Sequence, residues 1–407
     1  MALRTLDQSH KLRDVLYEIR GSALDEAARL EAEGYSVLKL NTGNPAAFGF
    51  DAPHQIVRDM IAAIPSAHGY SESRGILSAR RAVVTRYEME PGFPAFDVDD
   101  VYLGNGVSEL ITMVMQALLD EGDEVLIPSP DYPLWTAMTS LSDGKPVHYR
   151  CDENHGWEPD LEHIESLITP RTKAIVVINP NNPTGAVYSR EVLEGIARIA
   201  REHSLLVLSD EIYDRILFDG AVHTPFATVA PDLLVLTFNG LSKTYRVAGF
   251  RSGWLVITGP RDHAKGFLEG ITLLASTRLC PNVPAQHAVQ AALGGVQSIE
   301  GLIAPGGRLH EQREVAWSGL VKIPGVECVK PDGALYLFPR LDPEVHEIHD
   351  DSKFVYDLLV SEHILLVQGT GFNWPAHDHF RIVTLPEARV LADAVERLGN
   401  FLSSYRQ

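Results

Sequence analysis

The sequence predicts an α/β fold divided into two domains. Its 407 residues exceed the usual size of a single hydrophobic core, and 45% of them are hydrophobic, as in ordinary globular proteins. Apolar runs that read as buried strands pass into polar or glycine-containing loops at 101–110, 173–189 and 205–214. Beyond 308, short strand-like runs and a terminal helical pattern indicate a smaller α+β domain. We therefore expect an N-terminal arm that joins the small domain (1–45), a large domain (46–295) and a small C-terminal domain (296–407).

The first hundred residues predict an arm and two helices. Residues 11–34 have the pattern of an amphipathic helix or arm that ends at Gly34, and a short strand follows before the glycine and proline of NTGNP. Residues 54–64 and 76–89 are helical by pattern. The loop between them carries Tyr70, an aromatic that a core could also explain.

Residues 101–119 predict a strand, a glycine loop and a strongly apolar helix with Ser108 as its N-cap. Free amides at the start of a helix bind anions well. A dinucleotide fingerprint would need a third glycine after Gly104 and Gly106, at the position that Glu109 occupies. The segment therefore favours a phosphate site, with an unliganded glycine turn as the alternative.

Lys243 lies in a small-residue loop that follows an apolar run, and Arg251 comes shortly after it. A lysine at the mouth of a packed sheet can lose hydration and condense with a carbonyl to form a Schiff base, although an arbitrary lysine is far more often a solvated surface charge. Nearby strands end in asparagines and in Asp210. Pyridoxal phosphate needs a carboxylate for its ring nitrogen, a donor for its ring oxygen and a lysine for its aldehyde.

Three stretches, NPNNPTG (179–185), SDEIY (209–213) and SKTYRVAGFR (242–251), resemble the fold type I (class I/II) pyridoxal-phosphate aminotransferases. The resemblance covers nearly the whole chain. It implies a large domain with a mostly parallel sheet covered by helices, and pyridoxal 5′-phosphate as cofactor. It also implies amino acids and 2-oxo acids as substrates, and a homodimer with shared active sites.

The resemblance assigns a role to each motif residue. Lys243 would hold the aldehyde and then move a proton, Asp210 would keep the ring nitrogen protonated, and Tyr132 would stack on the ring. Asn182 and Tyr213 would hydrogen-bond the phenolate oxygen. Many relatives have a phosphate-binding serine where this chain has Gly240, so Ser242 is the expected substitute. The phosphate site would comprise Gly106, Val107, Ser108, Ser242 and Arg251, with Tyr70 reaching it from the other subunit.

Arg381 lies in a strand-like run, where its guanidinium could bind a carboxylate with two hydrogen bonds or form an ordinary surface salt bridge. The family pattern favours the substrate α-carboxylate, with Gly43 and Asn182 nearby. YEIRG, NTGNPAAFGFDAP, NGLSKTYRVAGFR and NWPAHDHFRIVTLP resemble bacterial glutamate–pyruvate (alanine) transaminases. The alternatives are an aromatic or broad-specificity aminotransferase and a carbon–sulfur lyase of the same fold.

Such an enzyme must accept both glutamate, with a distal carboxylate, and alanine, with a methyl group. A fixed buried cation opposite the methyl group would remain unpaired when alanine binds, which is costly. We therefore expect a mobile cation, with Arg20 as the candidate on the N-terminal arm, Tyr17 beside it and Thr42 as a neutral donor.

Other classes of function fit the composition poorly. With 35 basic and 54 acidic residues the net charge is −19, which disfavours nucleic acid. The three cysteines suggest neither disulfides nor zinc, and HEIHDD and HDH lack metal-site spacing, so no metal is predicted. No apolar stretch predicts a membrane segment or signal peptide, so a cytoplasmic enzyme is expected. The ligand-sensing domain of a transcription regulator would need a preceding helix-turn-helix, and the residues before NTGNP are not basic.

Overall fold

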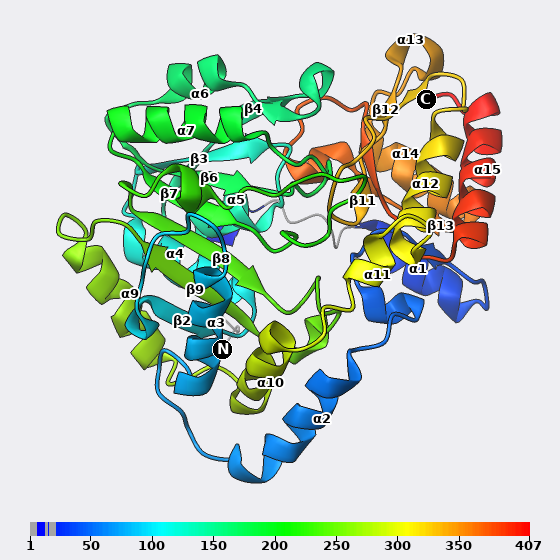
Figure 1. Ribbon diagram of the computed structural model, residues 1–407. Helices are drawn as coiled ribbons and strands as arrows, with labels where there is room; N and C mark the ends of the chain where they lie inside the picture. Colours follow the sequence, from blue (N-terminus) through cyan, green and yellow to red (C-terminus); the bar gives the residue numbers. More distant parts are fainter. Residues whose placement is uncertain (1–5, 13–14, 16–21) are drawn as a thin grey trace, which may run out of the picture.

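The computed structural model describes residues 6–12, 15 and 22–407 (Figure 1). Its main element is an eight-stranded sheet in the order β2-β9-β8-β7-β6-β3-β4-β5. The central pairs, from β4 through β3, β6 and β7 to β8, are parallel, and β2, β9 and β5 add antiparallel edges. This confirms the predicted α/β class and the mostly parallel sheet. The strands are β2 (Val101–Gly104), β3 (Glu124–Ser129), β4 (Lys145–Asp152), β5 (Glu158–Pro159), β6 (Thr172–Ile178), β7 (Leu206–Asp210), β8 (Val235–Gly240) and β9 (Gly253–Thr258).

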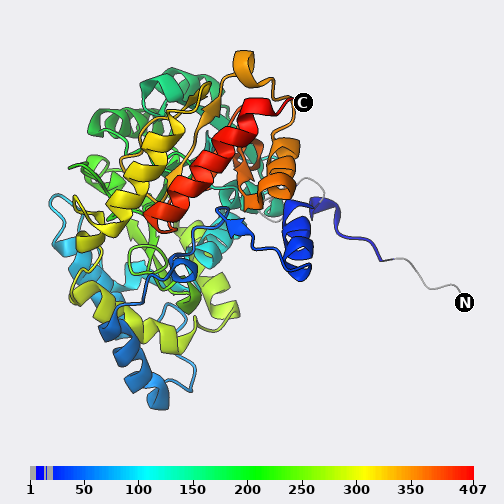
Figure 2. The ribbon, with the colours of Figure 1, turned by 90° about the vertical axis from the view of Figure 1, so that its right-hand side faces the viewer.

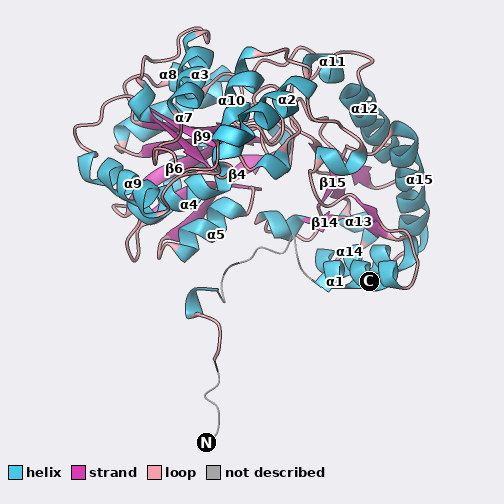
Figure 3. Ribbon diagram, turned by 90° about the horizontal axis from the view of Figure 1, so that it is seen from below, coloured by secondary structure: helices cyan, strands magenta, loops and turns pink. Residues whose placement is uncertain are grey.

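Helices cover both faces of this sheet, as Figure 3 shows from below. Alternate residues of a strand point to opposite faces, so Val125 and Ile127 pack toward α4, α5 and α9, whereas Leu126 packs toward α6, α7 and α8. Burial on both faces explains why the strands are continuous apolar runs. The helices around the sheet are α2 (His54–Ala63), α3 (Leu77–Glu88), α4 (Val107–Leu118), α5 (Leu134–Leu141), α6 (Leu161–Leu167), α7 (Arg190–Glu202), α8 (Phe226–Val229), α9 (Lys265–Thr277) and α10 (Val283–Gly294).

The C-terminal part has its own core around a three-stranded antiparallel sheet in the order β11-β15-β14. α12 and α15 pack side by side along it, as seen in Figure 2. The strands are β10 (Val326–Glu327), β11 (Tyr336–Leu337), β12 (Arg340–Leu341), β13 (Ile364–Leu365), β14 (Val367–Gln368) and β15 (Phe380–Val383). The helices are α11 (Glu300–Ile303), α12 (Arg308–Leu320), α13 (Pro343–His346), α14 (Asp351–Glu362) and α15 (Ala388–Ser404).

Residues 22–39 of the N-terminal segment pack against this C-terminal part, whereas the 3-10 segment His10–Leu12 contacts α5 beside the large sheet. β1 (Leu38–Lys39) pairs in parallel with β13, and α1 (Ser22–Ala32) contacts α14. The predicted domain limits after residues 45 and 295 stay a prediction. Among the helices of the described ranges, none combines the length and the apolar character needed to cross a bilayer.

Two predictions about helices can be compared with the structure, and one of them needs correction. Within 11–34, predicted as an amphipathic helix or arm, the described residues contain α1 (Ser22–Ala32), and a short 3-10 segment, His10–Leu12, lies before it. Ser108 is not an N-cap, because α4 begins at Val107 and its N-cap is Gly106, with φ of 79° and no capping side chain. Glycine adopts this positive φ without strain, so the helix starts two residues earlier than predicted and Ser108 lies within its first turn.

Candidate active site

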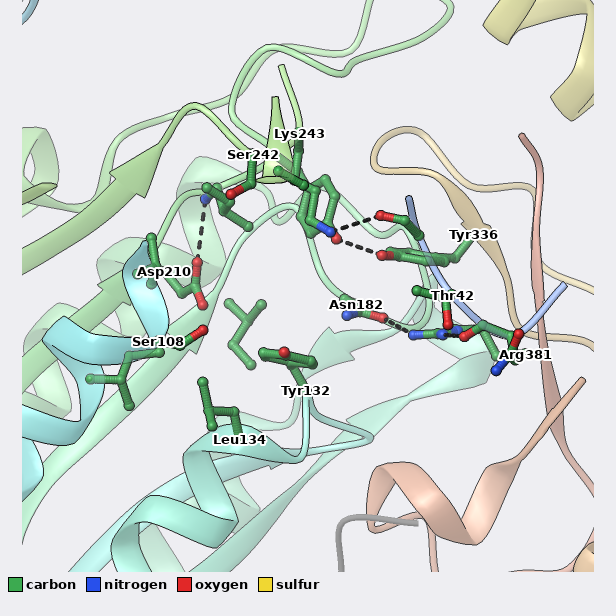
Figure 4. A pocket seen from close by; sticks show the side chains of 18 of the residues that line it. Thr42, Ser108, Tyr132, Leu134, Asn182, Asp210, Ser242, Lys243, Tyr336 and Arg381 are labelled. Atoms are coloured by element: carbon green, nitrogen blue, oxygen red, sulfur yellow. Dashed lines mark hydrogen bonds between the residues drawn. The ribbon is translucent and has the colours of Figure 1, made fainter. Parts of the chain in front are cut away.

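A cavity of about 310 Å³ lies where β6, β7 and β8 end. The carboxyl ends of parallel strands are the usual place for ligands in such sheets. Asp210 and Ser108 stand at one end of the cavity and Arg381 at the other, with Asn182 and Tyr132 between them (Figure 4). The predicted site residues that line it are Thr42, Gly43, Val107, Ser108, Tyr132, Asn182, Asp210, Tyr213, Ser242, Lys243, Arg251 and Arg381.

Lys243 extends into the cavity from the loop that follows β8. Its side chain is half-buried, and Nζ donates a hydrogen bond to the carbonyl oxygen of Gly43 at 2.9 Å. This contact joins the large sheet to the N-terminal segment. An amine that is partly shielded from water, in a cavity large enough for a ligand, can react with a carbonyl group.

Asp210 ends β7 and is almost fully buried, with 3% of its surface exposed. Its carboxylate accepts hydrogen bonds from Trp135 Nε1 at 3.1 Å and from the backbone N–H of Ile212 at 3.3 Å. Burial raises the pKa of Asp210 to about 6, although these hydrogen bonds and the charge of Lys243 oppose the rise. A cationic group placed beside it, such as a protonated ring nitrogen, would restore the carboxylate form. This end of the cavity therefore fits the pyridine ring of pyridoxal phosphate.

The start of α4 and Arg251 form a site suited to an anion. The guanidinium of Arg251 passes so close to Gly106 that a Cβ there would lie 2.6 Å from Nη2. Its Nη2 donates to the carbonyl oxygen of Asn105 at 3.2 Å. The free amides of Val107 and Ser108 add the partial positive charge of a helix N-terminus. These groups fit a phosphate.

The geometry also explains why residue 240 is a glycine. Gly240 is paired with Gly253 across β8 and β9, and a Cβ at 240 would lie 2.9 Å from two backbone atoms of the neighbouring strand. A serine at this position would force the strands apart. Ser242, two residues later, lines the cavity.

Arg381 is held rigidly on β15, with 2% of its surface exposed. Its guanidinium lies between the rings of Tyr336 and Phe372, 4.4 and 4.6 Å from their centroids. Nη1 donates to Asn182 Oδ1 at 3.0 Å, and Nη2 donates to the carbonyl oxygen of Asn41. This orientation suits recognition of a planar carboxylate.

Asn182 connects the two ends of the cavity. Because a guanidinium only donates hydrogen bonds, Asn182 must present its oxygen to Arg381. Its amide nitrogen then points away from Arg381, toward the side of Asp210 (Figure 4). One asparagine can therefore orient the carboxylate-binding arginine and donate to a second group.

Tyr336 is a cavity residue that the sequence analysis missed. Its hydroxyl lies 2.6 Å from that of Tyr213, and both side chains are buried. Tyr336 lies in ALYLFP (334–339), one of the short strand-like runs beyond residue 308, and a buried strand tyrosine looks like ordinary core. Asn41, Leu24 and Trp135 were also missed as parts of the site. Each comes from a different segment of the chain, and only the folding of distant segments brings it to the site.

Four predicted site residues are not among the described residues that line the cavity. Tyr70 is 83% exposed and does not line the cavity of this chain. Tyr17 and Arg20 lie outside the described residues. Gly106 does not itself line the cavity, but it positions the amides that do.

The sequence profile of the class I and II aminotransferases matches residues 35–398. The chain therefore belongs to this family, whose members use pyridoxal phosphate. It is 70% identical to the alanine aminotransferase of Mycobacterium tuberculosis H37Rv over 404 residues, which cover 99% of this chain and 94% of the relative. It is 60% identical to the glutamate-pyruvate aminotransferase AlaA of Escherichia coli K12 over 402 residues, 99% of each. A crystal structure of an Escherichia coli aminotransferase superposes with a TM-score of 0.98 at 59% identity, covering 99% of this chain and 100% of that one.

Proposed function

We propose that this protein is a pyridoxal-phosphate transaminase that moves an amino group between L-alanine and 2-oxoglutarate, giving pyruvate and L-glutamate, and the reverse. The observation that carries the proposal is one cavity that joins an amine (Lys243), a buried carboxylate (Asp210) and a planar carboxylate-binding group (Arg381). Identities of 60–70% over nearly the full length to enzymes named for this reaction support the choice of substrates. A cytoplasmic location stays a prediction.

The chain would hold the cofactor through groups already described. Arg251, Ser242 and the first amides of α4 would bind its phosphate, and Asp210 its ring nitrogen. Tyr132 would cover the ring, while Asn182 and Tyr213 would donate to its phenolate oxygen. When bound, the cofactor supplies an electron sink for the charge left at the substrate Cα.

Arg381 would bind the substrate, and Lys243 would transfer the proton. Arg381 binds the α-carboxylate and thereby places the Cα–H bond beside Nζ of Lys243. The free amine would take the proton from Cα as a general base and, as a general acid, would deliver it to C4′ of the cofactor within the same half-reaction. The enclosed cavity limits competition from water for this proton.

Single half-reactions test the substrate assignment. Alanine and glutamate should each change the visible absorbance of the holoenzyme and release pyruvate or 2-oxoglutarate. Tyrosine should react much more slowly, and cystathionine should release no thiol. A faster reaction with tyrosine, or release of thiol and ammonia from cystathionine, would instead favour one of the alternative activities.

We propose a homodimer with shared sites, because Tyr70 is an aromatic residue that is 83% exposed and belongs to none of the hydrophobic clusters of the described residues. Subunits of Lys243→Ala mixed with subunits of Tyr70→Phe should form hybrids in which one site has both native residues. With random exchange about one quarter of all sites would be native, so activity at limiting cofactor should exceed the mean of the two parents.

The matched control mixes Tyr70→Phe with a double Lys243→Ala, Tyr70→Phe variant, whose hybrids contain no native site. Equal activities in the two mixtures, or an active monomer in light scattering, would contradict the shared site.

The distal carboxylate of glutamate needs a further cation. Among the described residues that line the cavity, the basic side chains are Lys243, Arg251 and Arg381, and each already has another role. Arg20 therefore stays our candidate, with Tyr17 beside it and Thr42 on the cavity wall. Arg20→Met should slow the glutamate half-reaction about 10- to 1000-fold more than the alanine half-reaction, as for a lost charge-assisted hydrogen bond.

Arg29→Met is the control for this test, because Arg29 on α1 is exposed and pairs with Glu26 and Glu33. Equal losses for alanine and glutamate in Arg20→Met would place recognition of the distal carboxylate elsewhere.

A further inference from the structure

Tyr336 contacts three residues that line the cavity, Arg381, Tyr213 and Gly43. Its ring packs against the guanidinium of Arg381, and its hydroxyl lies 2.6 Å from the hydroxyl of Tyr213. The hydroxyl also lies against Gly43, where a Cβ would collide with it. Gly43 in turn accepts the hydrogen bond of Lys243. Tyr336 thus touches the carboxylate-binding arginine and the tyrosine assigned to the cofactor, and it packs against the glycine that holds the lysine.

The hydroxyls of Tyr213 and Tyr336 can each donate only one hydrogen bond. A phenol has one O–H donor, and its oxygen can accept. If Tyr213 donates to the phenolate oxygen of the cofactor, it has no proton left for Tyr336. The 2.6 Å contact is then a hydrogen bond only if Tyr336 donates to the oxygen of Tyr213.

We propose that Tyr336 is a positioning residue, which donates its hydroxyl proton to Tyr213 and so directs the proton of Tyr213 toward the cofactor. The proposal rests on the proposed function, because it assumes that Tyr213 serves the phenolate oxygen. Its ring also fixes the plane of Arg381, so one side chain links binding of the substrate carboxylate to the electronic state of the cofactor.

The electrostatic surroundings of the two phenols differ. Burial raises the pKa of Tyr213 well above its ordinary value, and the neighbouring Tyr336 adds to the rise. Burial opposes ionisation of Tyr336 as well, but the charges of Lys243 and Arg381 and the hydrogen bond with Tyr213 outweigh it and lower its pKa. Tyr336 is therefore the more acidic phenol of the two.

The hydroxyl and the ring of Tyr336 can be tested separately. Tyr336→Phe keeps the ring over Arg381 and removes the donor. The pKa read from the visible absorbance of the bound cofactor should rise by about one unit, because a chain of hydrogen bonds that stabilises the phenolate is shortened. kcat should fall about 10-fold while KM for alanine changes less than about 3-fold. Tyr336→Leu should also raise KM, because Arg381 loses one of its two stacking rings.

A double-mutant cycle decides whether Tyr336 acts through Tyr213. Tyr213→Phe should raise the same absorbance pKa, and adding Tyr336→Phe should then change it no further. An unchanged or lowered pKa in Tyr336→Phe, or additive shifts in the double variant, would overturn the proposal. If Tyr213→Phe itself leaves the cofactor pKa unchanged, the error lies in the role given to Tyr213 by the proposed function.

The cofactor-free protein gives a readout independent of catalysis. Ultraviolet difference titration should show one tyrosine that ionises before the others, and Tyr336→Phe should remove this step, whereas Tyr35→Phe, a half-exposed control, should keep it. Persistence of the early step in Tyr336→Phe would also contradict the assignment.

Discussion

Replacement of Lys243 by alanine is expected to reduce transamination by about 10⁴-fold or more, because the side chain serves as both nucleophile and proton carrier. Among the described residues that line the cavity, Lys243 is the only lysine. Its amine is held in place by the Gly43 carbonyl. Single-turnover reaction with alanine would measure the loss, and the visible absorbance of the purified protein would report whether the covalent attachment is lost.

Lys265→Ala, on α9, removes an exposed lysine that pairs with Asp262 and provides the control. An unchanged visible spectrum together with native half-reactions in Lys243→Ala would show that another group binds the aldehyde.

Asp210→Asn should weaken cofactor binding by about 10²- to 10³-fold, because removal of one partner of a buried charge pair costs several kcal/mol. The amide cannot hold a proton on the ring nitrogen, so the half-reactions should slow as well. Cofactor affinity by fluorescence titration and single-turnover rates measure the two effects. Glu211→Gln is the matched control: Glu211 is equally buried, and its hydrogen bonds are with Ser209 and Phe226.

In the cofactor-free protein, Asp210→Asn should increase the free energy of unfolding relative to the native chain as pH rises. Burial raises the pKa of Asp210 to about 6, above its value in the unfolded chain. Between about pH 4 and 6 the unfolded chain therefore loses this proton before the folded protein does, and folding stability falls as pH rises. Relative to the native chain, Asp210→Asn should therefore become more stable as pH rises through this range. Above the range the difference in free energy of unfolding should stay constant. A pH-independent difference in denaturant unfolding would contradict the raised pKa.

The cofactor end of the cavity was predictable because its residues belong to short motifs at the ends of adjacent parallel strands. The NPNNPTG loop, Asp210 and Lys243 each follow an apolar run, and β6, β7 and β8 are neighbours in the sheet. The apolar runs and the family resemblance therefore predicted the strands and the edge of the sheet at which these residues meet. The class of fold and the family are confirmed, and the individual roles of these residues stay predictions.

The substrate end depended on contacts that no local pattern records. Tyr336, Phe372 and Asn41 surround Arg381, yet they come from three separate segments and look like ordinary core or loop residues in the sequence. The prediction of Ser108 as N-cap failed for a related reason. Residue preferences favour serine there, whereas the observed N-cap at 106 has φ of 79°, which favours glycine.

The pairing of β1 with β13 implies that the cofactor end and the substrate end of the site form at different times during synthesis of the chain. Every strand of the large sheet has been synthesised once residue 258 has been added, whereas Leu38 waits for Ile364. Contacts between residues so distant in the chain form late, because the intervening loop must first be closed. A nascent chain can therefore assemble the groups for phosphate and ring nitrogen long before Arg381 exists. The ability to bind a substrate carboxylate arises only as the last strand, β15, is completed.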